Sequence, residues 1–277
     1  MKLTALVVIA ASAVVAGNAA GQDGVTRYVR YQHDGAISYG ILEGKTIHQL
    51  EGDLFTGSRQ RTGTKVATSE AHLLAPAVPS KVIAVGLNYK SHLGDREPAP
   101  YPGLFTKFPT SIVGPGDEIE MTADTKDLHY EGELVVAIGK RAEDVSVEDA
   151  PGYVLGVTAG NDVSERSWQR ADLQWFRAKG SDTFGPIGPA IVAGLDNGNL
   201  ALQTRLNGEV RQSSSTADLL FDIPTIVSYV SRYVTLLPGD LIFTGTPGAT
   251  SAMKPGDVVE IEIEGVGVLR NTVAAAR

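Results

Sequence analysis

Short apolar runs separated by turn sequences dominate this chain from residue 81 to its end. Pro-Gly-Asp occurs three times, at 115–117, 238–240 and 255–257, and proline and glycine in this arrangement favour tight turns between extended segments. Runs of about four to eight residues between such turns suit strands and are too short for most helices. The sequence therefore predicts a mostly β fold. The expected strands are 82–86, 118–121, 133–139, 154–158, 190–192, 201–207, 240–243 and 257–263.

Helical patterns are limited to three short stretches. They are 91–97, the stretch around Trp168 and Trp175, and 223–232, where Pro224 suits the first turn of a helix. We expect both tryptophans to pack in the core or in a dimer contact. Together with the strands, these stretches indicate an α+β chain with few helices.

The first 80 residues predict two further segments. Residues 1–21 begin with one lysine, continue as an apolar run and end in small residues. This pattern is typical of a secretory signal peptide, and the run is short for a membrane span. We therefore expect export to the periplasm or the exterior; if the segment is an uncleaved anchor or a buried helix, the protein is cytoplasmic.

Apolar and polar residues alternate around hairpin turns in 25–75 and predict a small β-rich domain. The main domain follows at 80–277.

Composition excludes several classes of partner. The chain has 32 acidic and 24 basic residues, a net charge of −8, and no Lys/Arg cluster, which argues against nucleic-acid binding. It has no cysteine, so disulfides and a lipid-modified cysteine anchor are excluded.

A pair of glutamates, Glu131 and Glu133, precedes the most apolar strand. Residues two apart on a strand point to the same face, and two carboxylates side by side are costly unless a cation lies between them. Asp162, just past the strand 154–158, would supply a third oxygen ligand. Three oxygen ligands with open positions favour Mg²⁺ or Mn²⁺, and zinc is less expected without cysteine. We expect His129, on the same face, to be a packed or hydrogen-bonded residue and not a ligand.

A candidate base lies on the predicted helix 91–97. His92 and Asp95 are three residues apart, so a helix would place the carboxylate where it can hold the imidazole and raise its basicity. The alternative is a surface histidine beside an unrelated acid. Further along the chain, Lys179 could balance the charge of the site. Its single positive charge and the two of a divalent cation would neutralise the three carboxylates.

Taken in order, these motifs resemble the fumarylacetoacetate hydrolase family. The match extends from about Lys81 to the C-terminus and covers most of the chain. The motifs are Asn88-Tyr89 with His92, Glu131-Gly132-Glu133, Asn161-Asp162-Val163-Ser164 with Arg166 and Gln169, Lys179-Gly180, 185–189, and 239–248.

The resemblance implies a mixed β-roll built of pseudo-barrel sheets, usually as a homodimer. It implies that Mg²⁺, or Mn²⁺ or Ca²⁺, is held by the equivalents of Glu131, Glu133 and Asp162. It also implies that Lys179, Arg166 and Gln169 line the substrate site, that His92 is the general base on a mobile lid, and that Thr246 helps to hold a substrate carboxylate. Members of the hydrolase branch commonly carry glutamate where this chain has Asp95, with Glu97 two residues further on.

The leading hypothesis is therefore a divalent-metal-dependent hydrolase that cleaves a carbon–carbon bond in a 2,4-dioxo acid of the acylpyruvate or fumarylpyruvate type. The runner-up is an isomerase or decarboxylase of 2-hydroxyhepta-2,4-diene-1,7-dioate-like or other 2-oxo acids, or a ureidoglycolate lyase-like enzyme. The alternative from a different class is an exported β protein that binds a cation without turnover.

Overall fold

The computed structural model describes residues 24–276. The predicted signal peptide at 1–21 lies outside the described residues and stays a prediction. Across residues 24–276, no helix combines the length and the apolar character that a membrane crossing needs.

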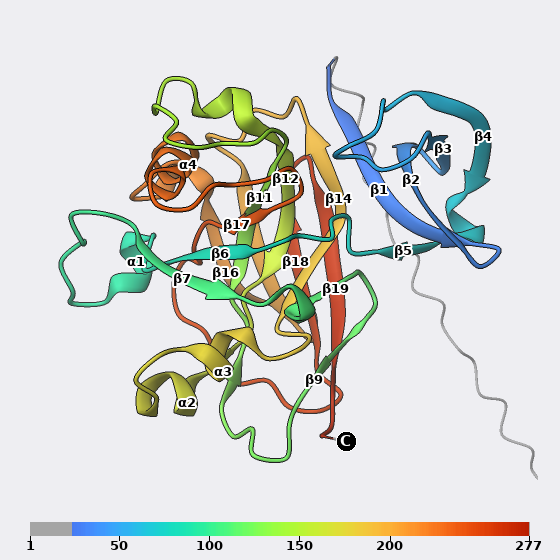
Figure 1. The fold of residues 1–277 in the computed structure, drawn as a ribbon. Helices are drawn as coiled ribbons and strands as arrows, with labels where there is room; N and C mark the ends of the chain where they lie inside the picture. Colours follow the sequence, from blue (N-terminus) through green and yellow to red (C-terminus); the bar gives the residue numbers. More distant parts are fainter. Residues whose placement is uncertain (1–23, 277) are drawn as a thin grey trace, which may run out of the picture.

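A twelve-stranded sheet forms the larger part of the fold (Figure 1). Its order is β4-β3-β2-β1-β14-β12-β11-β17-β6-β7, with β5 beside β1 and β8 beside β14. The strands are β1 (Thr26–His33), β2 (Ala36–Glu43), β3 (Thr46–Leu50), β4 (Arg61–Ala67), β5 (His72–Leu74), β6 (Val82–Gly86), β7 (Gly103–Lys107), β8 (Ile112–Val113), β11 (Gly132–Ile138), β12 (Val154–Asn161), β14 (Gly185–Ala193) and β17 (Leu241–Phe243).

A second sheet of five strands has the order β16-β15-β18-β19-β9, and β10 pairs with β13. These strands are β9 (Glu118–Glu120), β10 (Leu128–His129), β13 (Ser164–Glu165), β15 (Ala201–Leu206), β16 (Glu209–Ser215), β18 (Val258–Ile263) and β19 (Gly267–Ala274). The helices are short: α1 (Lys90–Leu93), α2 (Arg166–Ala171), α3 (Phe176–Gly180), α4 (Ile223–Ser231), and the 3₁₀ turns η1 (Thr68–Glu70), η2 (Pro109–Ser111), η3 (Ala150–Tyr153) and η4 (Thr216–Asp218). The predicted mostly β fold with a few short helices is confirmed.

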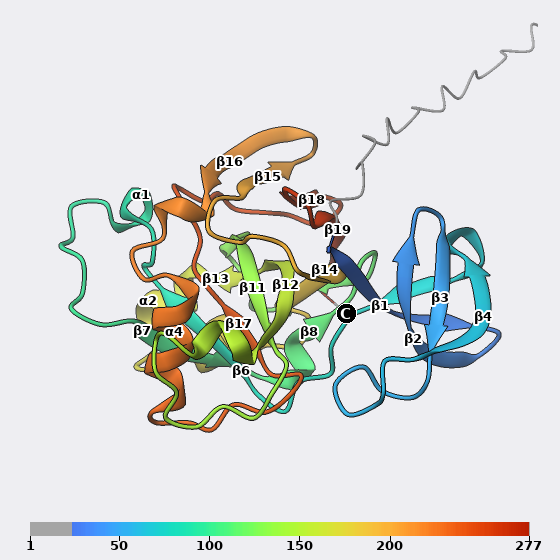
Figure 2. The same ribbon diagram turned by 90° about the horizontal axis from the view of Figure 1, so that it is seen from above.

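The strands β1 to β4 lie together at one side of the molecule in both views (Figures 1 and 2), and β5 pairs with β1. The first residues of β1 connect this unit to the rest, because Thr26 to Tyr28 pair antiparallel with Ile191 to Ala193 of β14.

The strand β11 is buried on both faces, which explains its continuous apolar run. Leu134 and Val136 pack in one cluster with Ile261 of the five-stranded sheet, whereas Val135 faces a second cluster on the other side. Because side chains alternate along a strand, Glu133 lies on the face of Val135, away from the five-stranded sheet.

Asp240, in the turn before β17, is expected to be a large contributor to stability. It is fully buried and accepts hydrogen bonds from the backbone nitrogens of Ser80, Lys81 and Leu237 at 3.1, 3.1 and 2.7 Å, and it pairs with the Lys81 ammonium. Asp240→Ala leaves these donors without an acceptor and should lower the free energy of unfolding by about 3 kcal/mol in a urea titration. The matched control is Asp117→Ala, in another Pro-Gly-Asp turn. The Asp117 carboxylate accepts one hydrogen bond, from Gly114 N at 2.7 Å. Equal losses in the two variants would contradict this account.

Candidate active site

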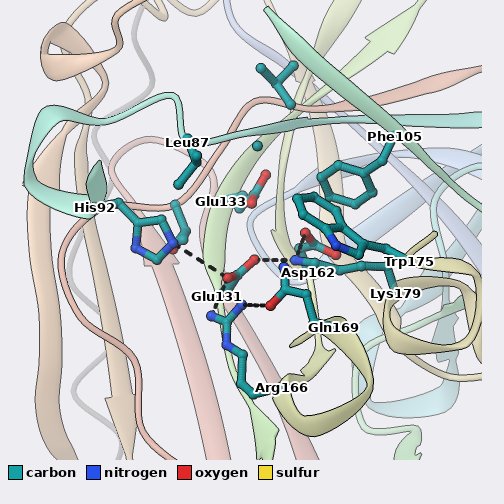
Figure 3. A pocket seen from close by; sticks show the side chains of 13 residues that line it. Leu87, His92, Phe105, Glu131, Glu133, Asp162, Arg166, Gln169, Trp175 and Lys179 are labelled. Carbon is teal, nitrogen blue, oxygen red and sulfur yellow. Dashed lines mark hydrogen bonds and ion pairs between the residues drawn. The ribbon is translucent and has the colours of Figure 1, made fainter. Parts of the chain in front are cut away.

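Three carboxylates converge at the end of β11, as the sequence predicted for Glu131, Glu133 and Asp162 (Figure 3). Pairing of β11 with β12 sets Glu133 opposite Gly160, and the backbone nitrogen of Asp162 donates to the carbonyl of Glu131 at 2.9 Å. One oxygen of each carboxylate lies within 4.8 Å of the others. All three residues are at most 4% exposed, so their charges depend on close partners.

Two of these carboxylates have cationic partners. The Lys179 ammonium, on α3, lies 2.6 Å from Glu131 Oε2 and 2.5 Å from Asp162 Oδ2, and Arg166, the first residue of α2, also pairs with Glu131. Burial alone would lower the pKa of Lys179, but the carboxylates of Asp162 and Glu131 outweigh it and raise that pKa. Burial alone would raise the pKa of Glu131, but Lys179 and Arg166 hold it well below its usual range. Lys179 and Glu131 therefore form an ionised pair.

A second buried lysine, Lys107, completes the cationic side of the cluster. Its Nζ lies 2.6 Å from Asp162 Oδ1 and also donates to the carbonyl of Lys179. Burial lowers the pKa of Lys107, against the attraction of Asp162. This residue was not predicted from the sequence, because 98–109 lacks a clear strand pattern. Its spacing of two from Phe105, which puts both side chains on one face of β7, is the signal that could have found it.

Glu133 is the carboxylate that lacks a cation. No lysine, arginine or histidine of the described residues forms an ion pair with it, and its hydrogen bond comes from the backbone nitrogen of Gly245 at 2.7 Å. Burial and the neighbouring carboxylates Asp162 and Glu131 raise the pKa of Glu133 well above its usual value. A divalent cation between the three carboxylates would supply the missing charge, and an all-oxygen donor set suits Mg²⁺, Mn²⁺ or Ca²⁺. The residues therefore fit such an ion.

His92 on α1 faces the cluster. Its Nε2 lies 3.8 Å from Glu131 Oε1 (Figure 3), and its Nδ1 makes a hydrogen bond to the carbonyl of Gly248. A carbonyl oxygen can only accept, so Nδ1 carries the hydrogen, and in the neutral imidazole Nε2 presents its lone pair to the site. This is the arrangement that a general base needs.

The structure does not place Asp95 beside His92. The predicted helix 91–97 ends at Leu93, because Gly94 turns the chain with a φ of 62°. The spacing of three therefore no longer sets the two side chains on one face, and Asp95 and Glu97 are both exposed. The partner of His92 is a backbone carbonyl from a distant turn.

The residues predicted to bind substrate are Arg166, Gln169 and Thr246. They line one cavity together with His92 and the three carboxylates. Arg166 donates to Gln169 Oε1 at 2.7 Å and to Thr250 Oγ1 at 3.0 Å. Thr246 is buried, with its hydroxyl donating to the carbonyl of Gly132 at 2.9 Å. Because their hydrogen bonds hold the side chains of Arg166 and Gln169 in place, these two can orient an anionic ligand without reorganising.

An aromatic wall closes the other side of the cavity. Trp175 and Phe105 meet edge to face with ring centroids 5.2 Å apart, and Val85 and Leu87 line the same cavity. Trp168 packs in the core as predicted, and Trp175 packs against the same cluster and also lines the cavity. The lining therefore combines charged side chains on one side with aromatic and aliphatic side chains on the other.

His129 lies outside this cavity. Its ring nitrogens make hydrogen bonds of 2.9 Å to Asp127 Oδ1 and 2.8 Å to Thr250 Oγ1. It is a hydrogen-bonded residue that supports Thr250, which in turn accepts from Arg166.

Glu165 fixes the start of α2 and makes the stability of this region dependent on pH. Its carboxylate accepts bonds from Trp168 N at 2.7 Å, Ser167 Oγ at 2.7 Å and Asp127 N at 2.6 Å. Burial opposes ionisation, but these bonds hold the pKa of Glu165 below its usual value. Since an unfolded glutamate titrates near pH 4.3, the carboxylate stabilises the fold above about that pH, and the contribution is lost as the pH falls through the folded-state pKa.

Glu165→Gln should therefore lower the free energy of unfolding by about 1 kcal/mol at pH 7, as the loss of a helix cap does. The difference from the unmodified chain should shrink as the pH is lowered below 4.3. Urea titrations at several pH values measure both effects, with Glu148→Gln, at an exposed position, as the control. A difference that grows toward acid pH would contradict the assignment.

Comparison with known proteins gives consistent matches along the chain. Residues 81–274 match the family described as fumarylacetoacetate (FAA) hydrolase C-terminal, and residues 26–76 match the family described as Rv2993c-like, N-terminal. Protein Rv2993c of Mycobacterium tuberculosis is 45% identical over 223 residues, which cover 78% of this chain and 84% of that protein. The mitochondrial oxaloacetate tautomerase FAHD2A of Bos taurus is 42% identical over 220 residues, covering 74% of this chain and 70% of the tautomerase.

Solved structures agree with these matches. The 5-carboxymethyl-2-hydroxymuconate delta-isomerase of Mycobacterium smegmatis has a TM-score of 0.86 and 42% identity, covering 90% of this chain and 99% of the isomerase. The maleylpyruvate hydrolase of Sphingobium sp. SYK-6, in complex with manganese(II) and pyruvate, has a TM-score of 0.76 and 26% identity, covering 91% of this chain and 100% of the hydrolase.

Proposed function

The chain belongs to the fumarylacetoacetate hydrolase family, and on that premise we propose that it is a divalent-metal-dependent tautomerase or isomerase of a small 2-oxo acid. In this reaction a proton is removed from the carbon next to the keto group, and a proton is returned at the oxygen or at another carbon. The observation that carries the proposal is the state of His92. Its Nε2 is free to accept a proton at the site, and its Nδ1 is held by the Gly248 carbonyl and not by a carboxylate.

This state of His92 suits proton transfer at carbon. A histidine that activates water is commonly supported by an acid that stabilises the imidazolium, as in Ser-His-Asp sites. Here the support is a neutral carbonyl, which fixes the tautomer and leaves one nitrogen to take up a proton and return it. Such a base is worth about 10²- to 10⁴-fold in rate.

The remaining groups bind the substrate and stabilise the enolate that forms. The Lys179 ammonium can donate a hydrogen bond to the developing enolate oxygen, and Arg166 with Gln169 can orient a carboxylate. The wall of Phe105 and Trp175 excludes water from the reacting carbon. A divalent cation held by the three carboxylates would polarise the keto group and carry part of the negative charge.

The charge of the site favours a dianionic substrate. The formal charges of the three carboxylates are balanced by those of Lys107, Lys179 and Arg166, so a bound divalent ion would leave a formal excess of two positive charges. An oxo dicarboxylic acid would neutralise that excess. The oxaloacetate tautomerases that resemble this chain are named for a substrate of this kind.

Hydrolysis of a carbon–carbon bond in a 2,4-dioxo acid is the second candidate. It is favoured by the similarity to maleylpyruvate hydrolase and by the two exposed acids, Asp95 and Glu97, that follow α1. Water activation would need one of these acids to reach His92. Export and a homodimeric assembly stay predictions from the sequence.

Proton exchange distinguishes the candidates. The purified chain with Mn²⁺ is incubated with oxaloacetate in D₂O, and deuterium incorporation at C3 is followed by NMR beside release of pyruvate from an acylpyruvate. We expect Mn²⁺-dependent exchange that a chelator abolishes and that His92→Asn slows by about 10²-fold or more. Faster pyruvate release than exchange would make the protein a hydrolase. Metal binding without either reaction would make it a cation-binding protein without turnover.

A further inference from the structure

Gln212 reaches the site from the other sheet. It lies on β16 of the five-stranded sheet, yet its side chain is 3% exposed and enters the region of the carboxylates. Its Nε2 donates to Thr246 Oγ1 at 2.8 Å and to the carbonyl of Pro247 at 2.6 Å, and its Oε1 accepts from Gly132 N at 3.1 Å. The amide thereby uses both donors and its acceptor.

The groups that Gln212 holds belong to two parts of the site, the strand that carries Glu131 and Glu133 and the turn 245–248. Gly132 is the residue between Glu131 and Glu133, so its peptide nitrogen sets the backbone that carries both carboxylates. The turn 245–248 supplies the backbone nitrogen that binds Glu133 at 2.7 Å and the carbonyl that binds His92 Nδ1. One side chain therefore connects the acidic strand to the turn that fixes the base.

The five-stranded sheet also leaves no free space at this point. A Cβ on Gly132 would lie 2.0 Å from Thr204 Oγ1 of β15 and 3.4 Å from Gln212 Oε1. The backbone between the two glutamates therefore lies directly against β15 and β16, and its position depends on how Gln212 bonds to it.

We propose that Gln212 is a positioning residue that fixes the distance between the metal-binding glutamates and His92. The proposal rests on the metal site of the proposed function. Glutamine is suited to the task because glutamate would set a carboxylate against the Pro247 carbonyl, and methionine would fill the space without any of the three bonds.

The test compares Gln212→Met with Gln203→Met, a half-buried glutamine on the neighbouring strand β15. For each full-length variant, Mn²⁺ affinity is measured by calorimetry, kcat and KM in the exchange assay, and Tm by circular dichroism. We expect Gln212→Met to bind Mn²⁺ about 10- to 100-fold more weakly and to lose kcat by a similar factor, with KM changed by less than about threefold. Gln203→Met should match the unmodified chain in Mn²⁺ affinity and in kcat.

A double-mutant cycle adds a readout that loss of packing alone does not give. If Gln212 acts through Thr246, the effect of Gln212→Met on Mn²⁺ affinity should be much smaller in a Thr246→Val background. A lower Tm with unchanged Mn²⁺ affinity and kcat, or full additivity in the cycle, would overturn the positioning role. If the unmodified chain binds no Mn²⁺, the metal site itself fails, and the proposal for Gln212 fails with it.

Discussion

Glu133→Gln is expected to weaken Mn²⁺ binding by about 100-fold or more, while the metal-free protein stays as stable as the unmodified chain or becomes more stable. Glu133 is buried beside two other carboxylates and has no ion-pair partner among the described residues. Glutamine avoids the cost of ionising a buried carboxylate in the absence of metal, but it replaces one of three anionic ligands of the ion by a neutral amide oxygen.

Glu131→Gln is the matched control for this prediction. Glu131 also belongs to the cluster, but it pairs with Lys179 and Arg166. Its loss should weaken Mn²⁺ binding similarly and, in addition, lower the metal-free stability by about 3 kcal/mol, because two cations lose a partner. Calorimetry and urea titration of both variants without metal separate the two effects. If Glu133→Gln lowers the metal-free stability as much as Glu131→Gln does, the inference that Glu133 has no cationic partner without metal is wrong.

Lys179→Met is expected to reduce kcat by about 10³-fold while Mn²⁺ affinity is retained or increased. The ammonium lines the cavity and can stabilise the enolate oxygen, and the loss of one such donor typically costs about 10²- to 10³-fold. Removing a positive charge next to Glu131 and Asp162 makes the cluster more attractive to a cation.

Lys107→Met is the control that tests this role. Lys107 pairs with the other oxygen of Asp162 and is fully buried behind the cavity. Lys107→Met should lower the free energy of unfolding but reduce kcat only modestly in the same exchange assay. An equal loss of kcat in both variants would assign Lys179 to charge balance alone.

The features that the sequence could predict are those set by local spacing. The alternation along β11 puts Glu131 and Glu133 on one face, and Asp162 follows because β12 is the antiparallel neighbour of β11. The turns at Pro-Gly-Asp mark strand ends in the same local way. Such patterns depend on a few adjacent residues and on strand geometry.

The features that could not be predicted depend on contacts between distant segments. His92 is held by the carbonyl of Gly248, 156 residues away, and Gln212 contacts Gly132 from another sheet. Neither a backbone carbonyl nor a lone glutamine has a sequence signature. The pairing of His92 with Asp95 fails for a local reason, since it required a helix to continue through Gly94, whose positive φ ends it.

The most direct test of the central claim is a calorimetric titration of the metal-free chain with Mn²⁺, with and without oxalate, an analogue of a 2-oxo acid enolate. We expect one saturable site per chain, tighter binding in the presence of oxalate, and loss of both in Glu133→Gln. The absence of saturable binding, or binding that neither oxalate nor Glu133→Gln changes, would contradict a site in which Glu131, Glu133 and Asp162 together hold a divalent cation for a 2-oxo acid.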